Sequence, residues 1–554
     1  MKKPSASGIK ARLTSVSAWE LPKEESAIAP PEVWTNKDMD PTPPEQQTWG
    51  IWTIMAYWAT DTVNMGTWET ASSMLAVGLS WREAIPAIIV GISCVSVVMV
   101  LNGAIGSKLH VPFSVATTSG FGYYMRYFCI ISRSVLALFW LGIQGANGAQ
   151  CMTIMFTAIA PSYANIPNTL PASSGITTMG MVSYFLFWII QLPLLLIHPT
   201  KLKAIFLIKL VAAPVTAIAT LAWCIHKAGG SGDIFKLEAA VSGSEKAYLW
   251  LSCMTAISGC WSTLACNIPD FTRYAKTGNG QFIQLPFIPI IFTVCGVLGI
   301  LTTSAAKVFT GEYLWNPLDV IVLWLDMGHG GRAAAFFAAL SWYIAQVGTN
   351  ITTNSVSAAN DLTVLFPRYV NIKRGCMIAA FAAGWILVPW KIISSANVFL
   401  AFMGGYSVFL APLASILAVD FWLVKRCHVD IPALYDPNGR YRYTKGCNWR
   451  AFVAFIVPVA PLLPGLAQSI SPNTVHVSAG IMQLYDINWL FGFLTAATLY
   501  TGLSWIFPAK ETLLTDTIWV RGEIEGVRVS DSDIESPAPG MDSGKMMTED
   551  IKAL

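Results

Sequence analysis

Trp140 and Gln144 are the residues whose chemistry is most distinctive in this chain, and both lie in the long apolar run 135–160. They are four residues apart, so they share one face if the run is helical. An indole can stack on a planar ring, and an amide can donate to and accept from polar groups on its rim. The pair therefore predicts a site for a flat, polar small molecule. The alternative is a packing tryptophan beside a glutamine that bonds a neighbouring helix.

The composition places this pair inside a membrane protein. Of 554 residues, 54% are hydrophobic and only 12% are charged, whereas soluble domains contain roughly 25% charged residues. Apolar stretches of about 20 residues recur, which is the length that a helix needs to cross a bilayer. We therefore expect an all-α polytopic protein embedded in a lipid bilayer. A formal net charge of +3 is too small to indicate nucleic-acid binding.

About twelve membrane spans are expected in a transmembrane domain of residues 47–508, between a polar tail (1–46) and a second tail (509–554). The first tail has no apolar segment of the signal-peptide type, so the first span is expected to direct insertion. The end of the second tail is rich in Ser, Asp and Glu and is expected to be disordered. The spans are expected near residues 48–78, 84–107, 132–160, 177–197, 203–226, 247–267, 284–307, 331–361, 375–392, 395–424, 451–468 and 487–507.

Lysines and arginines are concentrated in the loops after the even-numbered spans, and the opposite loops contain fewer of them. The richer loops contain, among others, Lys108, Arg126, Arg273, Arg368 and Arg440. The positive-inside rule then places both tails in the cytosol.

Two of the expected spans are interrupted by small and polar residues. The first span contains Asp61, Asn64 and Gly66, and the sixth contains the stretch from Gly259 to Trp261. The third span carries Gln144 and the eighth has a polar run from Thr349 to Asn354. Two interrupted segments, each followed two spans later by a polar-faced helix, indicate an inverted repeat of five plus five helices. Such a repeat is typical of a secondary transporter.

Several polar residues could bind a solute or an ion in such a protein. Asp61 is an acid near the middle of a span, and burial favours its protonated form, so it could exchange a proton near neutral pH. Glu69 is a weaker candidate for the same role. In the eighth span, the hydroxyls and amides could bind a neutral solute, and threonine oxygens also suit a hard cation. The alternative for this group is hydrogen bonding between helices. We expect Asp270 to form a structural or gating ion pair with Arg273 or Lys276.

The chain lacks the motifs of metal sites and of ATP-driven transport. The six histidines form no HxxxH or His/Glu cluster, and the 11 cysteines form no CxxC, so no metal site is indicated. The chain also lacks a P-loop, so ATP-driven transport is not supported.

Taken in order, the motifs of this chain resemble those of the nucleobase–cation symporter-1 family, in its fungal branch of uracil, allantoin and uridine permeases. The resemblance covers nearly the whole chain. The motifs are the segment from Trp34 to Pro44, the pair Trp140 and Gln144, Gly259 to Trp261 followed by Asn267 to Tyr274, Thr349 to Asp361, and Tyr441 to Arg450.

The resemblance implies a LeuT-like fold and a set of site residues. Trp140 and Trp261 would stack on the substrate ring, while Gln144 and Asn354 would bond its amide edge. Asn64 is assigned to the substrate from the first span, where Met65 is the alternative. Residues of the tenth span, Phe402 and Met403, would line a selectivity gate.

The resemblance also implies a coupling ion. In sodium-coupled relatives a cation site joins the broken first helix to an Ala and then a Ser-Thr pair of the eighth. This chain has Ala345 and then Gly348-Thr349, so one hydroxyl is missing. The difference favours protons, exchanged with Asp61, over sodium.

We therefore expect a symporter that imports allantoin or uracil across the plasma membrane by alternating access, without a cofactor besides the coupling proton. Uridine, thiamine or another vitamin-like solute is the alternative substrate. A membrane nutrient sensor that does not transport is the alternative from a different class. An intramembrane enzyme would lack a nucleophile and base. Lys545 and Lys552 are expected to accept ubiquitin through ubiquitin ligase adaptors at the tail.

Overall fold

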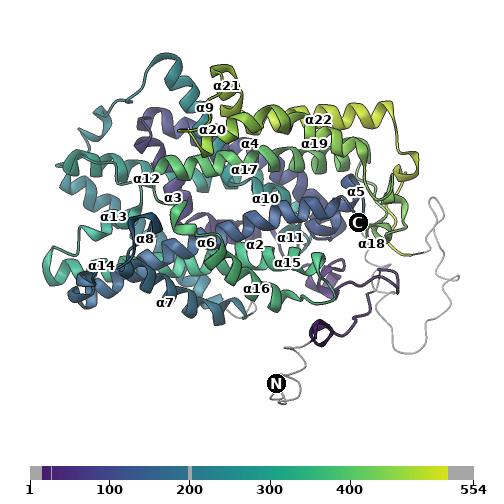
Figure 1. Ribbon diagram of the computed structural model, residues 1–554, viewed down its shortest axis with the longest axis horizontal. Coiled ribbons are helices and arrows are strands. Elements are labelled where there is room, and N and C mark those ends of the chain that lie inside the picture. Colours follow the sequence, from purple (N-terminus) through teal and green to yellow (C-terminus); the bar gives the residue numbers. More distant parts are fainter. Residues whose placement is uncertain (1–14, 27, 198–202, 522–554) are drawn as a thin grey trace.

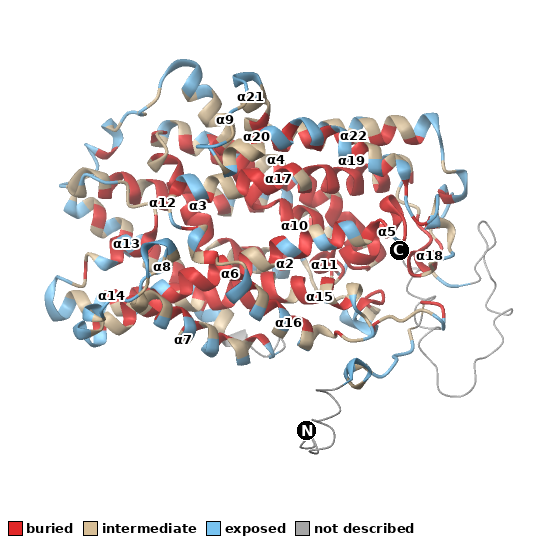
Figure 2. Ribbon diagram, in the orientation of Figure 1, coloured by how far each residue is buried: buried red, intermediate tan, exposed pale blue. Residues whose placement is uncertain are grey.

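The protein is a bundle of helices, most of which run along its long axis (Figure 1). The computed structural model describes residues 15–26, 28–197 and 203–521, and within them the only β-type pairings are isolated bridges. The acidic end of the second tail, with Lys545 and Lys552, lies outside the described residues. The most buried of the long apolar helices are α4 (Trp81–Leu109), α6 (Arg126–Ile159) and α17 (Ala396–Val419), which form the centre of the bundle (Figure 2).

Eight helical segments of the described residues are long and apolar enough to cross a membrane, judged by length and composition. Helix α8 illustrates how they are solvated, because it exposes Leu207, Val211 and Val215 on its outer face. Such a face suits lipid tails rather than water. Besides α4, α6, α8 (Lys203–Lys227) and α17, the segments contain α7 (Thr178–Leu195), α12 (Gln284–Thr310), α19 (Trp449–Val459) with α20 (Leu463–Ile470), and α22 (Asn488–Ile506).

The other four expected spans are built from shorter helical segments. The predicted breaks in the first and sixth spans are confirmed, and two π-helical turns interrupt the eighth and ninth. The segments are α2 (Ile51–Thr62) and α3 (Met65–Ala76); α9 (Gly243–Cys260) and α10 (Ser262–Asn267); α14 (Gly328–Thr349), η9 (Asn350–Ser355) and α15 (Val356–Leu365); and α16 (Ile372–Phe381) with η10 (Ala382–Ile386).

Asn64 stabilises the break between α2 and α3. Its side-chain oxygen accepts from the backbone N–H of Thr67 at 3.0 Å, so Asn64 caps the start of α3. Its side-chain nitrogen donates to the carbonyl of Asp61 at the end of α2, at 2.5 Å. One amide thus satisfies backbone groups on both sides of the break, which a helix interrupted in an apolar environment requires.

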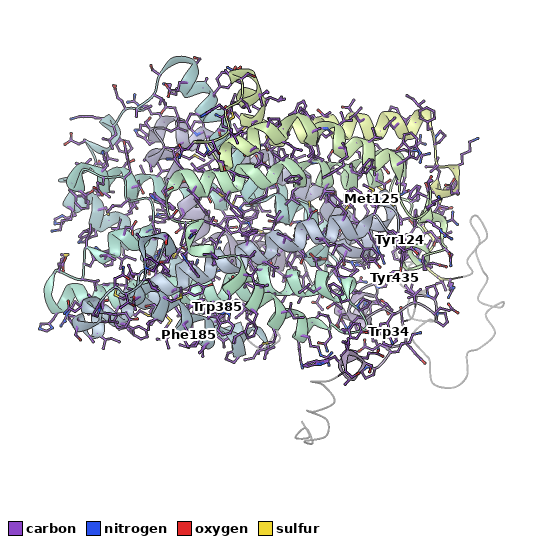
Figure 3. The ribbon with its side chains drawn as sticks, viewed as in Figure 1. Trp34, Tyr124, Met125, Phe185, Trp385 and Tyr435 are labelled. Atoms are coloured by element: carbon purple, nitrogen blue, oxygen red, sulfur yellow. The ribbon has the colours of Figure 1, made fainter. Side chains whose placement is uncertain are left out.

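The chain ahead of the first span packs against one end of the bundle. The Tyr435 hydroxyl of α18 (Ile431–Tyr435) donates to the carbonyl of Met39 at 2.7 Å, and Arg368 lies over the Trp34 ring at 5.2 Å. Figure 3 shows Trp34 and Tyr435 at the same end as Tyr124. We call this end the tail end, and the opposite end, where α13 (Pro317–Val322) lies, the far end (Figure 1).

The expected ion pair of Asp270 with Arg273 or Lys276 is wrong. Asp270 accepts instead from the backbone N–H of Phe113 at 2.9 Å, and Arg273 Nε donates to Thr42 Oγ1 at 2.6 Å. Arg273 also donates to two backbone carbonyls of the same N-terminal segment. Because this segment supplies neutral acceptors for the guanidinium, the carboxylate is not needed as its partner.

We predict that Gly91→Ala lowers the stability of the bundle. A Cβ at Gly91 of α4 would lie 2.7 Å from the carbonyl oxygen of Met254 and 2.9 Å from Cβ of Ile257, both on α9. The two helices would have to separate, at a cost of roughly 1–3 kcal/mol. The measurement is thermal unfolding of the detergent-purified protein.

Gly404→Ala is the matched control, because a Cβ there would meet nothing within 4 Å on α17. It is expected to leave the melting temperature unchanged or slightly higher, since alanine is the better helix former. Equal melting temperatures for Gly91→Ala and the unsubstituted protein would contradict this account of the packing.

Candidate functional site

A cavity lies where the breaks of the first and sixth spans meet α6 and the π-helical turn η9. Aromatic, amide and hydroxyl side chains line it together, a combination that is typical of a small-molecule site. Toward the tail end its lining includes Arg133, Asn267 and Ser357. Seven of the predicted site residues line it, namely Asp61, Asn64, Trp140, Gln144, Trp261, Thr349 and Asn354.

Two tryptophans supply the aromatic part of the lining. Trp140 Nε1 donates to the Tyr406 hydroxyl at 3.2 Å, which fixes the indole of α6 against α17. Trp261 is the residue at the break between α9 and α10, and its ring lies 5.4 Å from Trp58 and 5.8 Å from Phe292. Both indoles are therefore held by neighbours before any ligand enters.

Gln144 is oriented by a second glutamine that the sequence analysis did not single out. Gln346 Nε2 donates to Gln144 Oε1, and Gln346 Oε1 accepts from the backbone N–H of Met65 at 3.4 Å. Gly66 keeps the space beside this amide open, because a Cβ there would lie 3.2 Å from Gln144 Nε2 and 3.4 Å from the Trp140 ring. The amide nitrogen of Gln144 is thus presented beside a glycine backbone at the cavity wall.

Asn354 is the second amide of the cavity and belongs to the turn η9. Its Nδ2 donates to Asn350 Oδ1 at 2.9 Å, and Asn350 Nδ2 donates to Gln191 on α7 at 2.9 Å. Asn350 is fully buried, whereas Asn354 lines the cavity. A π-helical turn at such a position is typical of functional sites. The chain of amides fixes the orientation of Asn354.

Asp61 lies in a buried charge cluster at the edge of the cavity. Its carboxylate accepts from Thr352 Oγ1 at 2.9 Å and from the Thr353 hydroxyl, and Lys209 Nζ lies 3.8 Å away. Lys209 also donates to Thr349 Oγ1 at 2.7 Å. An ammonium of α8 therefore occupies the space between α2 and the eighth span.

Lys209 was not predicted from the sequence, although its position in the chain indicates a function. Lys209 lies inside the apolar run Phe206 to Val211, and a charged residue at membrane depth indicates function by default. Gly348 makes room for it, since a Cβ there would lie 3.1 Å from Lys209 Cδ. The lysine stem thus lies against Gly348, the position at which sodium-coupled relatives are expected to carry a hydroxyl.

A second buried ion pair, also missed, closes the tail end of the cavity. Arg133 of α6 forms a salt bridge with Asp361 of α15, and both side chains are almost completely buried. Arg133 Nη2 also donates to the carbonyl of Ser357 at 2.7 Å. Because Asp361 lies beside the guanidinium, Arg133 brings no unpaired positive charge into the cavity.

Three predicted site residues do not line the cavity. Phe402 packs between Tyr406 and Phe139, each with ring centroids 5.2 Å from its own. Met403 is fully buried, and its sulfur accepts from Thr70 Oγ1 at 3.5 Å. Ala345 is buried one turn before Thr349. Because their side chains pack between helices, their assignment to a gate or a cation site stays a prediction.

Known proteins match this chain over most of its length. The family model described as "Permease for cytosine/purines, uracil, thiamine, allantoin" matches residues 41–492. An uncharacterized permease of Schizosaccharomyces pombe is 37% identical over 87% of this chain and 86% of its own length. The allantoin permease and the uracil permease of Saccharomyces cerevisiae are 31% and 30% identical, each over 88% of this chain and 78% of its own length.

Solved structures match the fold. Mhp1 in its inward-facing conformation superposes with a TM-score of 0.69 and 21% identity, over 87% of this chain and 97% of Mhp1. Mhp1 is described as a nucleobase–cation symport-1 family transporter, and its closed form with bromovinylhydantoin bound gives a TM-score of 0.65, with 21% identity over 86% of this chain and 97% of Mhp1. The expected LeuT-like fold is confirmed. The chain belongs to the family of permeases for cytosine and purines, uracil, thiamine and allantoin.

Proposed function

We propose that this permease imports a planar, amide-edged nucleobase-related solute such as allantoin or uracil, together with a proton, by alternating access. The observation that carries the proposal is the lining of the cavity, which combines the indoles of Trp140 and Trp261 with the amides of Gln144 and Asn354. Aromatic faces can stack on a ring, and amides can pair with alternating N–H and C=O groups. The relatives that are named allantoin and uracil permeases support these substrates.

The charge balance of the lining supports a neutral substrate. Arg133 is paired with Asp361, and Asp61 lies beside Lys209, so each charge in the lining has an opposite charge close to it. A charged solute would leave one unpaired charge in a poorly solvated space, which is costly. A neutral ring with polar edges needs only hydrogen bonds.

The coupling ion that we propose is a proton, and Lys209 supports it. Its ammonium already lies between Asp61 and Thr349, where a cation would otherwise bind. Sodium would have to compete with this fixed charge. A lysine and a carboxylate can instead exchange protons, so the cluster could be loaded and unloaded as access changes sides.

The membrane and the orientation complete the proposal. We place the protein in the plasma membrane. Both tails lie in the cytosol, and the tail end faces the cytosol, because lysines and arginines are concentrated in the loops of that side. Tail lysines such as Lys545 and Lys552 would then be accessible to ubiquitin ligase adaptors. Phe402 and Met403 would tune selectivity from behind Tyr406 and Thr70.

We predict that Asn354→Ala abolishes uptake while the protein still reaches the cell surface, because the ring would lose one edge contact. The measurement is uptake of radiolabelled uracil, allantoin, uric acid, uridine and thiamine in cells without their own permeases. Unchanged uptake by the variant would contradict the site assignment. If the unsubstituted protein reaches the cell surface normally but takes up none of these five compounds, the result would indicate a sensor instead.

We predict a smaller defect for Gln346→Leu. The variant keeps Gln144 but removes the hydrogen bond that orients it, worth about 1–1.5 kcal/mol, so the half-saturation constant should rise roughly tenfold. The matched control is Gln468→Leu, whose amide oxygen accepts from the Val477 N–H in a loop. A half-saturation constant unchanged in Gln346→Leu would show that Gln144 needs no such support.

We predict that Lys209→Met uncouples transport. The variant should no longer accumulate substrate. The unsubstituted protein should accumulate substrate as long as a proton gradient is present. Replacing sodium with another cation should not change this accumulation. Lys307→Met, at the exposed end of α12, is the control and should behave normally. A sodium requirement, or normal accumulation by Lys209→Met, would contradict proton coupling through this cluster.

A further inference from the structure

A second buried acid lies between the cavity and the far end. Glu69 is on α3, one turn beyond Met65, and faces Asn147 on α6, one turn beyond Gln144. Asn147 Nδ2 donates to Glu69 Oε2 at 2.8 Å, and both side chains are fully buried. This contact joins the far half of the broken helix to the helix that carries Trp140 and Gln144.

Two acceptor atoms of this pair have no hydrogen-bond partner. They are Glu69 Oε1 and Asn147 Oδ1, and neither has one among the residues that the structure describes. An ionised carboxylate with a single amide donor would leave its charge largely uncompensated in an apolar surrounding. One proton on Glu69 Oε1 would remove the charge and would add a hydrogen-bond donor to a pair that has two unpartnered acceptors.

The groups that face Glu69 do not supply a positive charge. Asp319 faces it from α13 and the thiol of Cys151 from α6, and α4, α9, α12, α14 and α17 direct no charged side chain at it in the described part of the chain. No ion pair within 4 Å includes Glu69 among these residues, in contrast to Asp61, which has an ammonium at 3.8 Å and two hydroxyl donors. The two buried acids therefore have opposite surroundings.

We propose that Glu69 and Asn147 form a second proton-binding site, in which Glu69 Oε1–H donates to Asn147 Oδ1 while Asn147 Nδ2 donates to Glu69 Oε2. Acid and amide then make two antiparallel hydrogen bonds, and no buried acceptor is left over. The proton comes from solvent at the far end and returns there, and no covalent bond to carbon changes.

The site acts as a proton-dependent latch at the far end, which rests on the proposed alternating-access function. In this structure α3 is held at the far end by a further contact, since Ser72 Oγ of α3 donates to the Trp315 carbonyl at 2.6 Å and Trp315 stacks on Phe399. When α3 and α6 separate, Glu69 is hydrated and ionises with the ordinary affinity of a carboxyl group. Closure must then take up a proton, and reopening releases it to the same side. The latch proton is not transported.

Glu69→Gln tests the latch, because a glutamine amide can make the same pair of hydrogen bonds with Asn147 without a proton. The assay is substrate counterflow in proteoliposomes with equal pH on both sides, so that no proton gradient contributes. In the unsubstituted protein, the rate of counterflow should fall by about tenfold for each unit by which the pH rises, in the pH range where closure limits this rate. Glu69→Gln should keep the rate seen at acidic pH across the range, with an unchanged number of protons per substrate. Glu312→Gln, in the loop after α12, is the control.

Two results would overturn the latch. Glu69→Gln could retain the normal pH profile, which would mean that this carboxyl does not titrate during the cycle. It could also fail to transport at any pH while folded and inserted, which would mean that the negative charge itself is required.

Infrared spectroscopy of the purified protein separates the latch from the transport proposal. A carbonyl band of a protonated carboxyl group should be present in the unsubstituted protein at neutral pH and should be lost in Glu69→Gln. This result is expected even if every substrate of the panel fails. Absence of any such difference would overturn the proposed proton at Glu69.

Discussion

The structure depends on how one carboxylate is accommodated at the interruption of the first membrane helix. Asp61 is nearly buried, and removing a partner from a buried ion pair costs several kcal/mol. Its partners come from α8, through Lys209, and from the eighth span, through Thr352 and Thr353. Three helices that are distant in sequence must therefore meet here. Gly348 is required where the lysine stem passes.

The same residues connect this charge cluster to the substrate cavity. Thr353 donates to Asp61, and its neighbour Asn354 lines the cavity with its amide. Asn64 lines the cavity as well, while its side chain caps α3 and holds the last turn of α2. A change of protonation at Asp61 or Lys209 would thus be transmitted to the cavity wall within one turn of helix. This short path is the physical basis that we propose for coupling proton to solute.

Sequence reasoning predicted the class, the helix breaks and most of the cavity lining, because these follow from composition and from polar residues at regular spacing. Trp140, Gln144 and Asn354 stand out in apolar runs, and the resemblance relates them to one site. Long-range partners were missed, since no local pattern pairs Arg133 with Asp361 or Gln144 with Gln346. Lys209 was missed for a different reason, because a single lysine in an apolar run forms no motif and its partner Asp61 lies about 150 residues earlier in the chain. The ion pair expected for Asp270 is absent because the N-terminal segment, which we expected only as a polar tail, supplies the hydrogen-bond acceptors of Arg273.

The central claim is that a flat, amide-edged ring binds between the two indoles and the two amides. The most direct measurement is an electron cryomicroscopy structure of the purified protein with uracil or allantoin added. We predict density for the ring between Trp140 and Trp261, with its polar edge within hydrogen-bond distance of Gln144 and Asn354. A ligand bound elsewhere, with this cavity free of ligand density, would contradict the account.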